Sequence, residues 1–217
     1  MLESFKINCF PLNRAIRITI NLPKNYNNTN RYYPVVYVLD GQNAFNDKDS
    51  FRGVSLSLQE SIDKLESIGK YAIYICIASA IDQEKREKEY KESILSDFIL
   101  NEIHPLLKTR YRMNNYIYSL GCSKASYQAL KLGYSSEFKG SILLSPVGDF
   151  KNFNKPTSSK LVFLYAGKNE LDGACLKCIS QIKEINDLVH VFTDDSIIHS
   201  EESWKTKIFQ ALNFLIL

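Results

Sequence analysis

The sequence predicts a doubly wound α/β domain with a mainly parallel sheet. Short, unbroken runs of β-branched and aromatic residues alternate with longer segments of helical period. Strands that are covered on both faces consist of such runs, and helices between them form the crossover connections of parallel strands. We expect a single domain over residues 1–217, because a chain of this length that is 45% hydrophobic can bury one substantial core.

The N-terminal elements differ from those that follow. Residues 5–10 and 15–22 alternate between apolar and polar side chains, which is typical of antiparallel strands at a sheet edge. Buried strands are expected at 35–39, 72–78, 116–120, 141–144 and 161–166, and a further strand begins at 189. Helices are expected at 54–68, 93–110, 124–133, 173–187 and 201–216. Polar loops are expected at 25–31, 82–91 and 149–160, and the last of these is too short to form a cap domain.

Charge and hydropathy exclude several classes of function. The net charge of +3 is too small to indicate nucleic-acid binding or an anionic membrane surface. No apolar run is long enough to cross a bilayer, and the first residues do not resemble a signal peptide. We therefore expect a cytoplasmic protein with no nucleic-acid or membrane partner.

The five cysteines do not predict a disulfide framework, because they are odd in number and scattered. Cys175 and Cys178 have the C-x-x-C spacing, but they lie in a helical segment without a second pair of ligands for zinc. We interpret them as two cysteines one helical turn apart, and we expect no metal site.

Ser123 lies at the carboxyl end of a predicted strand and just before a predicted helix. Small residues two positions before and after it, Gly121 and Ala125, fit the tight turn of a nucleophile elbow. A serine at this place is also a common helix N-cap, so the tripeptide alone leaves both interpretations open. Its position favours the first, since ligands of parallel sheets bind beyond the carboxyl ends of the strands.

A nucleophilic serine needs a base, and a carboxylate that orients the base. Of the three histidines, only His199 is expected at the same sheet edge as Ser123. The strand expected at 161–166 is followed by Glu170, which we favour as the acid, with Asp172 as the substitute. The chain order serine, acid, histidine is that of the α/β-hydrolase fold.

Two backbone amides are candidates for an oxyanion hole. One belongs to Lys124, which follows the serine, and the other to Gln42, which follows the Asp40-Gly41 turn at the end of the first parallel strand. The charge of Lys124 would either favour anionic ester portions or serve only solubility.

Four segments together resemble the putative-esterase family of α/β-hydrolases. They are residues 33–45, Arg86 with Glu89-Tyr90, Gly121-Cys-Ser-Lys-Ala125, and residues 199–204. That family includes enterochelin esterases, S-formylglutathione hydrolases, feruloyl and acetylxylan esterases, and mycolyltransferases. The resemblance extends over nearly the whole chain, from about Arg17 to Leu217, and implies the fold without specifying a substrate.

The resemblance implies a serine hydrolase that cleaves carboxylic esters, with Ser123 as nucleophile, His199 as base and Glu170 as acid. It also places the second oxyanion donor at Gln42. The sequence departs from the family pattern in two ways: Ala125-Ser126 stands where two glycines are usual, and many members carry aspartate in place of Glu170. A non-catalytic binding protein on the same scaffold, or an acyltransferase, is therefore the alternative. The expected partner is a small-molecule ester, and the mechanism requires no cofactor.

Overall fold

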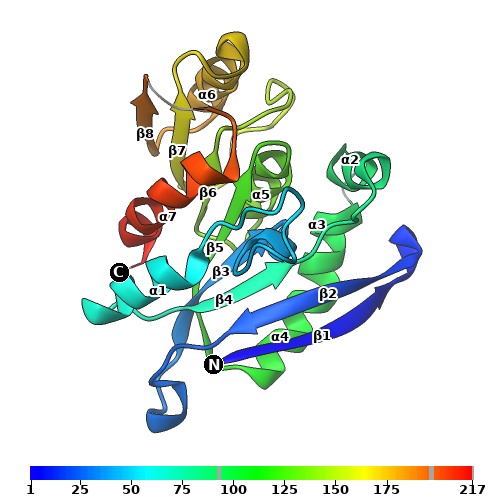
Figure 1. Ribbon diagram of the computed structural model, residues 1–217, viewed down its shortest axis with the longest axis vertical. Coiled ribbons are helices and arrows are strands. Elements are labelled where there is room, and N and C mark those ends of the chain that lie inside the picture. Colours follow the sequence, from blue (N-terminus) through cyan, green and yellow to red (C-terminus); the bar gives the residue numbers. More distant parts are fainter. Residues whose placement is uncertain (92–93, 196–197, 217) are drawn as a thin grey trace.

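One eight-stranded sheet forms the centre of the computed structural model, which describes residues 1–91, 94–195 and 198–216 (Figure 1). The strand order is β1-β2-β4-β3-β5-β6-β7-β8. Strand β2 runs antiparallel to both of its neighbours, and all other neighbouring strands are parallel. The mainly parallel sheet with an antiparallel N-terminal edge is thereby confirmed. The strands are β1 (Leu2–Cys9), β2 (Arg14–Asn21), β3 (Tyr33–Leu39), β4 (Ile73–Ile77), β5 (Met113–Cys122), β6 (Gly140–Leu144), β7 (Leu161–Gly167) and β8 (Val189–Asp194).

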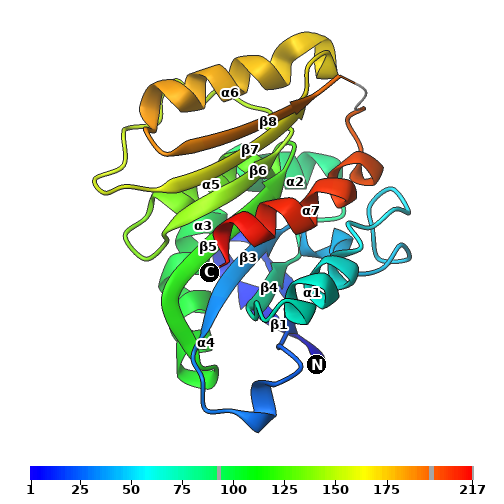
Figure 2. The same ribbon diagram turned by 90° about the vertical axis from the view of Figure 1, so that its left-hand side faces the viewer.

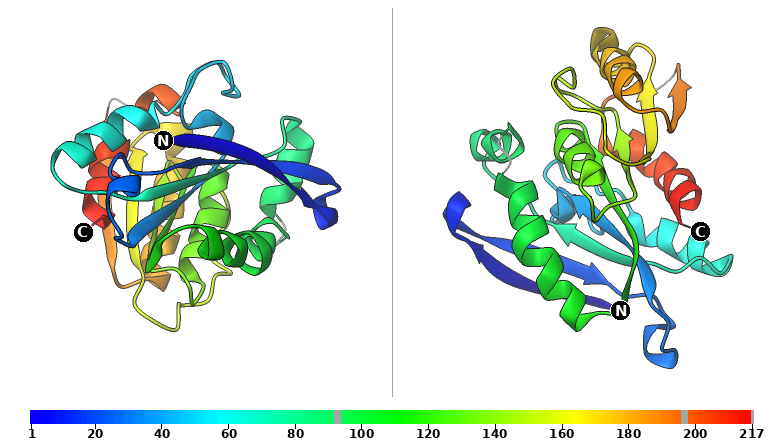
Figure 3. Two further views of the ribbon diagram at one scale, coloured as in Figure 1. Left: turned by 90° about the horizontal axis from the view of Figure 1, so that it is seen from below. Right: turned by 180° about the vertical axis from the view of Figure 1, so that it is seen from behind.

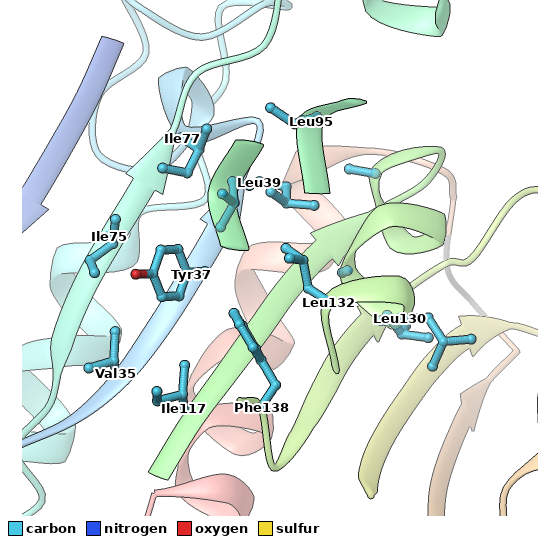
Figure 4. Packing of buried hydrophobic residues seen from close by; sticks show 14 of the residues in the cluster. Val35, Tyr37, Leu39, Ile75, Ile77, Leu95, Ile117, Leu130, Leu132 and Phe138 are labelled. Carbon is cyan, nitrogen blue, oxygen red and sulfur yellow. The ribbon is translucent and has the colours of Figure 1, made fainter. Parts of the chain in front are cut away.

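Helices cover both faces of the sheet (Figures 2 and 3). On one face lie α1 (Leu58–Ser67) and α7 (Glu201–Leu215), and on the other lie α3 (Ile94–Phe98), α4 (His104–Arg110), α5 (Ala125–Tyr134) and α6 (Ala174–Ile185). Side chains alternate along the central strands. Val36 and Val38 pack toward α1 and α7. Tyr37 and Leu39 pack into the hydrophobic cluster on the other face, beneath α3, α4, α5 and α6 (Figure 4). This two-sided burial explains why the strands are continuously apolar.

The segment 82–91 is not a loop, contrary to the expectation from the sequence. It forms helix α2 (Gln83–Lys91), and Asp82 caps its start by accepting a hydrogen bond of 2.9 Å from the backbone N–H of Lys85. The segment lacks an apolar stripe, which is why its hydrophobic pattern does not predict a helix.

Charged groups of α2 take the place of an apolar face. The Glu89 side chain is 4% exposed and accepts hydrogen bonds of 2.5 Å and 2.9 Å from the Arg14 guanidinium. It also accepts a bond of 3.1 Å from the backbone N–H of Ala80. Part of the charged run 84–89 is therefore buried and attaches α2 to the edge of the sheet.

The expected helix 93–110, whose first residue lies outside the described part of the chain, is divided. Helix α3 leads through a π-helical turn, Ile99–Ile103, into α4. Pro105 explains the wider turn, because proline has no N–H for the α-helical ladder and its ring needs room in the preceding turn. No described helix is both long enough and apolar enough to span a bilayer.

The carboxyl ends of β3, β5, β6 and β7 meet at one edge of the sheet, where Asp40, Ser123, Ser145 and Glu170 follow them in turn. Residues 145–160, between β6 and β7, contain no helix or strand. No cap domain is therefore inserted at this position, as the sequence predicts, and the edge is open.

We predict that Glu89→Ala destabilises the fold by about 3 kcal/mol, because it leaves the Arg14 guanidinium and the Ala80 amide without their buried partner. Glu84 is an exposed glutamate of the same helix, and Glu84→Ala should change the free energy of unfolding by less than about 0.5 kcal/mol. Urea denaturation measures both variants. Equal stability of the two would contradict the anchoring role of Glu89.

Candidate active site

Ser123 occupies a tight turn between β5 and α5. Its backbone lies in the left-handed region, with φ of 54°, and its N–H donates a bond of 2.9 Å to the carbonyl of Leu144. A Cβ at Gly121 would lie 2.5 Å from the carbonyl oxygen of Ala125, so only glycine fits there. The turn has the strand-to-helix geometry of a nucleophile elbow.

The two elbow residues that stand in place of glycines fit into this turn. Ala125 and Ser126 are both fully buried. The Ser126 hydroxyl donates a hydrogen bond to the carbonyl of Ser123, which satisfies the buried polar group. The extra hydroxyl therefore supports the conformation of the elbow.

His199 is the histidine that the fold brings to the serine. Its Nε2 lies 2.7 Å from Oγ of Ser123, and its Nδ1 lies 2.7 Å from Oε1 of Glu170. His104 is buried against a tyrosine of β3, and His190 stacks on a phenylalanine of α7. The imidazole of His199 thus connects the hydroxyl and the carboxylate in one chain of hydrogen bonds.

Of the two candidate acids, Glu170 contacts the histidine and Asp172 is exposed. The second oxygen of Glu170 accepts bonds of 2.8 Å from the Ser145 hydroxyl and 2.8 Å from the N–H of Gly167. Burial acts to raise the pKa of this carboxyl, but the hydrogen bonds from His199, Ser145 and Gly167 outweigh it and hold the pKa below its ordinary value. The carboxylate is therefore ionised at neutral pH.

Ser145 is a site residue that the sequence analysis missed. It follows β6 with φ of 50°, and its hydroxyl accepts a bond of 2.8 Å from Nε1 of Trp204 while donating to Glu170. The Trp204 ring meets the His199 ring edge to face, with centroids 5.1 Å apart. The sequence position of Ser145 could have indicated a site residue, because Ser145 directly follows β6, as Ser123 follows the adjacent β5.

The loop after β3 is fixed by a buried ion pair. Asp40 accepts bonds of 2.9 Å from Nε of Arg86, 2.7 Å from the Tyr90 hydroxyl and 2.6 Å from the Ser79 hydroxyl. Burial would raise the pKa of Asp40, but the Arg86 guanidinium and the two hydroxyls lower it. Helix α2 therefore holds the turn on which Gln42 lies.

The side chain of Gln42 is bound to Ser79, with Nε2 donating over 3.0 Å to the hydroxyl and Oε1 accepting over 3.0 Å from the backbone N–H. Asp40, Asn43 and Lys124 line the cavity above Ser123. The roles of the Gln42 and Lys124 amides as oxyanion donors remain predictions.

A cavity of about 310 Å³ opens at Ser123 and His199. Phe51, Leu56 and Trp204 contribute apolar wall to it. A cavity of this size suits a small ligand whose reacting group lies between the hydroxyl and the loop after β3.

Three side chains with metal-ligating atoms, Glu170, Cys175 and His199, lie within 4.8 Å of one another. The carboxylate and the imidazole are already bonded to each other. Burial, with smaller contributions from Glu170 and Cys178, raises the pKa of the Cys175 thiol to about 12, whereas a metal binds the thiolate. The cluster therefore suits a hydrogen-bonded pair better than a metal ion.

Comparisons place these features among known proteins. A sequence profile of the family described as "Putative esterase" matches residues 11–206. No curated protein matches the sequence. Among solved structures, the IroE-like serine hydrolase of Shewanella oneidensis has a TM-score of 0.75 and 16% identity, over 100% of this chain and 80% of that one. The siderophore hydrolase of Aspergillus nidulans has a TM-score of 0.75 and 15% identity, over 99% and 95%.

The enterobactin esterase of Shigella flexneri has a TM-score of 0.77 and 18% identity, over 99% of this chain and 59% of that one. At these identities the likeness establishes the fold, which is the α/β-hydrolase fold that the order of serine, acid and histidine predicts.

The lowered pKa of Glu170 predicts a pH-dependent contribution to stability. This contribution is present above about pH 4.5, the ordinary pKa of the group, and is lost as the pH falls through the lower folded-state value. Glu170→Gln should therefore reduce the loss of unfolding free energy between about pH 5 and pH 3. Asp172→Asn, at an exposed carboxylate, is the control, and its unfolding free energy should depend on pH as that of the wild type does. Urea denaturation across this pH range measures the dependence. A wild-type dependence in Glu170→Gln would contradict the lowered pKa of Glu170.

Proposed function

Because the chain belongs to the putative esterase family, we propose that it is a serine esterase that hydrolyses small carboxylic esters through an acyl-enzyme. One observation carries the proposal: the His199 imidazole is hydrogen-bonded at the same time to the Ser123 hydroxyl and the Glu170 carboxylate. A hydroxyl, a base and an orienting acid in this order are what nucleophilic catalysis by serine requires.

In the first step, Ser123 Oγ attacks the ester carbonyl and His199 Nε2 takes the hydroxyl proton. Glu170 holds the Nδ1–H tautomer and stabilises the imidazolium that forms. Because Ser145 and the Gly167 amide fix the carboxylate, the imidazole is oriented before the substrate arrives. His199 then returns the proton to the leaving alkoxide, which departs as the alcohol.

The negative charge that develops on the carbonyl oxygen needs donors on the opposite side. We assign this role to the backbone N–H groups of Lys124 and Gln42. Two observations support the assignment: Lys124 follows the nucleophile, and the turn before Gln42 is held by the pair of Asp40 and Arg86. Water then attacks the acyl-enzyme, with His199 again acting as base, and releases the acid and Ser123.

We predict that Ser123→Ala lowers kcat for p-nitrophenyl acetate by about a thousandfold or more, because no other group supplies the nucleophile. The release of p-nitrophenol measures the rate after the spontaneous reaction is subtracted. Ser136→Ala, at an exposed serine, is the control and should hydrolyse the ester at the wild-type rate. Equal rates of Ser123→Ala and wild type would refute the proposal.

A further inference from the structure

The charged side chains around the cavity are unequally paired. Those that line it are Asp40, Arg52, Arg86, Lys124 and Glu201. Asp40 and Arg86 form a buried ion pair, and Lys124 contacts Glu87. Arg52 is exposed, and Glu201 is 8% exposed. Within residues 1–91, 94–195 and 198–216, these last two have no hydrogen-bond or ion-pair partner.

The pairing of Lys124 bears on the expectation that its charge selects anionic esters. Its ammonium is already bound to the Glu87 carboxylate, and the two side chains are 40% and 35% exposed. An anionic substrate would have to compete with Glu87 for this cation. Lys124 is therefore a weak candidate for a specificity determinant.

Glu201 is the buried charge that the proposed mechanism does not use. It is the first residue of α7 and lies two positions after His199. Its carboxylate oxygens are not among the fully enclosed polar atoms without a partner in the described residues, so they keep contact with solvent, and the residue lines the cavity. The helix N-terminus favours this negative charge, but no cationic side chain of the described residues is paired with it. A cation that enters the cavity can therefore form the ion pair that the protein does not supply.

We propose that Glu201 selects the substrate by binding a protonated amine, so that the preferred substrates are esters carrying an ammonium group in the acyl or the alcohol portion. The inference rests on the proposed esterase function. An ammonium both donates hydrogen bonds and balances the buried charge, whereas a neutral hydroxyl does only the former. The exposed Arg52 is screened by solvent and opposes a cation only weakly.

Two pairs of isosteric esters test the proposal. Ethyl 4-aminobutanoate is compared with ethyl pentanoate, and 3-aminopropyl butanoate with butyl butanoate, so that in each pair a protonated amine replaces a methyl group, first in the acyl and then in the alcohol portion. Acid release at pH 7 gives kcat/KM, and the ratio of the charged to the neutral ester is the quantity of interest. In Glu201→Gln this ratio should fall about tenfold or more in at least one pair.

The matched control is Glu202→Gln. Glu202 is the next residue of α7, but its side chain is 64% exposed and it is paired with Lys205 over 2.6 Å. This variant removes one negative charge at the same helix end without touching the cavity lining. It should keep the wild-type ratio for both pairs of esters.

A wild-type ratio in Glu201→Gln for both pairs would overturn the role of Glu201, and the esterase function would stand if the neutral esters are still hydrolysed through Ser123. A wild type that hydrolyses none of the four esters would remove the proposed function, and this inference with it. If Glu201→Gln does not fold, inhibition of the wild type tests the proposal instead. Butylammonium must then inhibit hydrolysis of ethyl pentanoate more strongly than 1-butanol does, and equal or weaker inhibition would overturn the proposal.

Discussion

The two hydrogen bonds of the His199 imidazole, to Ser123 and to Glu170, are the constraint on which the site depends. They connect three elements that are distant in sequence: the end of β5, the end of β7 and the start of α7. Each bond has a length of 2.7 Å, so a small displacement of any element would break the chain. The parallel sheet supplies the required rigidity, because its strands are packed on both faces.

The sheet edge that carries the site also concentrates unfavourable backbone conformations. Four residues at or just beyond the ends of β3, β5, β6 and β7 have φ between 50° and 54°. They are Asp40, Ser123, Ser145 and Leu171, in that order. Each such residue costs on the order of 1–3 kcal/mol. Specific side chains offset this cost: Arg86 and Tyr90 hold Asp40, and Trp204 holds Ser145. The conformation of these strand-end residues is thus maintained by side chains from other elements.

The sequence predicts most of this arrangement, because the position of a residue at a strand end depends on local hydrophobic pattern and chain order. Ser123, Glu170 and His199 were each expected at the same edge for that reason. The choice between Glu170 and Asp172 needs the structure, since both follow β7 and only the left-handed turn at Leu171 separates their directions. Helix α2 was missed because its contacts are charges paired with remote residues, such as Arg14, which leave no periodic apolar signal. Ser145 was missed for a similar reason, as its partners come from two other elements.

The catalytic role proposed for Ser123 is tested by treating the folded protein with a fluorophosphonate and mapping the modified residue by mass spectrometry. We expect a single adduct on Ser123, because only a serine whose proton can pass to a base attacks phosphorus rapidly. The rate of labelling should fall when His199 is replaced by alanine. An unlabelled Ser123 in folded protein, or an adduct on another residue, would contradict the activation of Ser123 by His199 and Glu170.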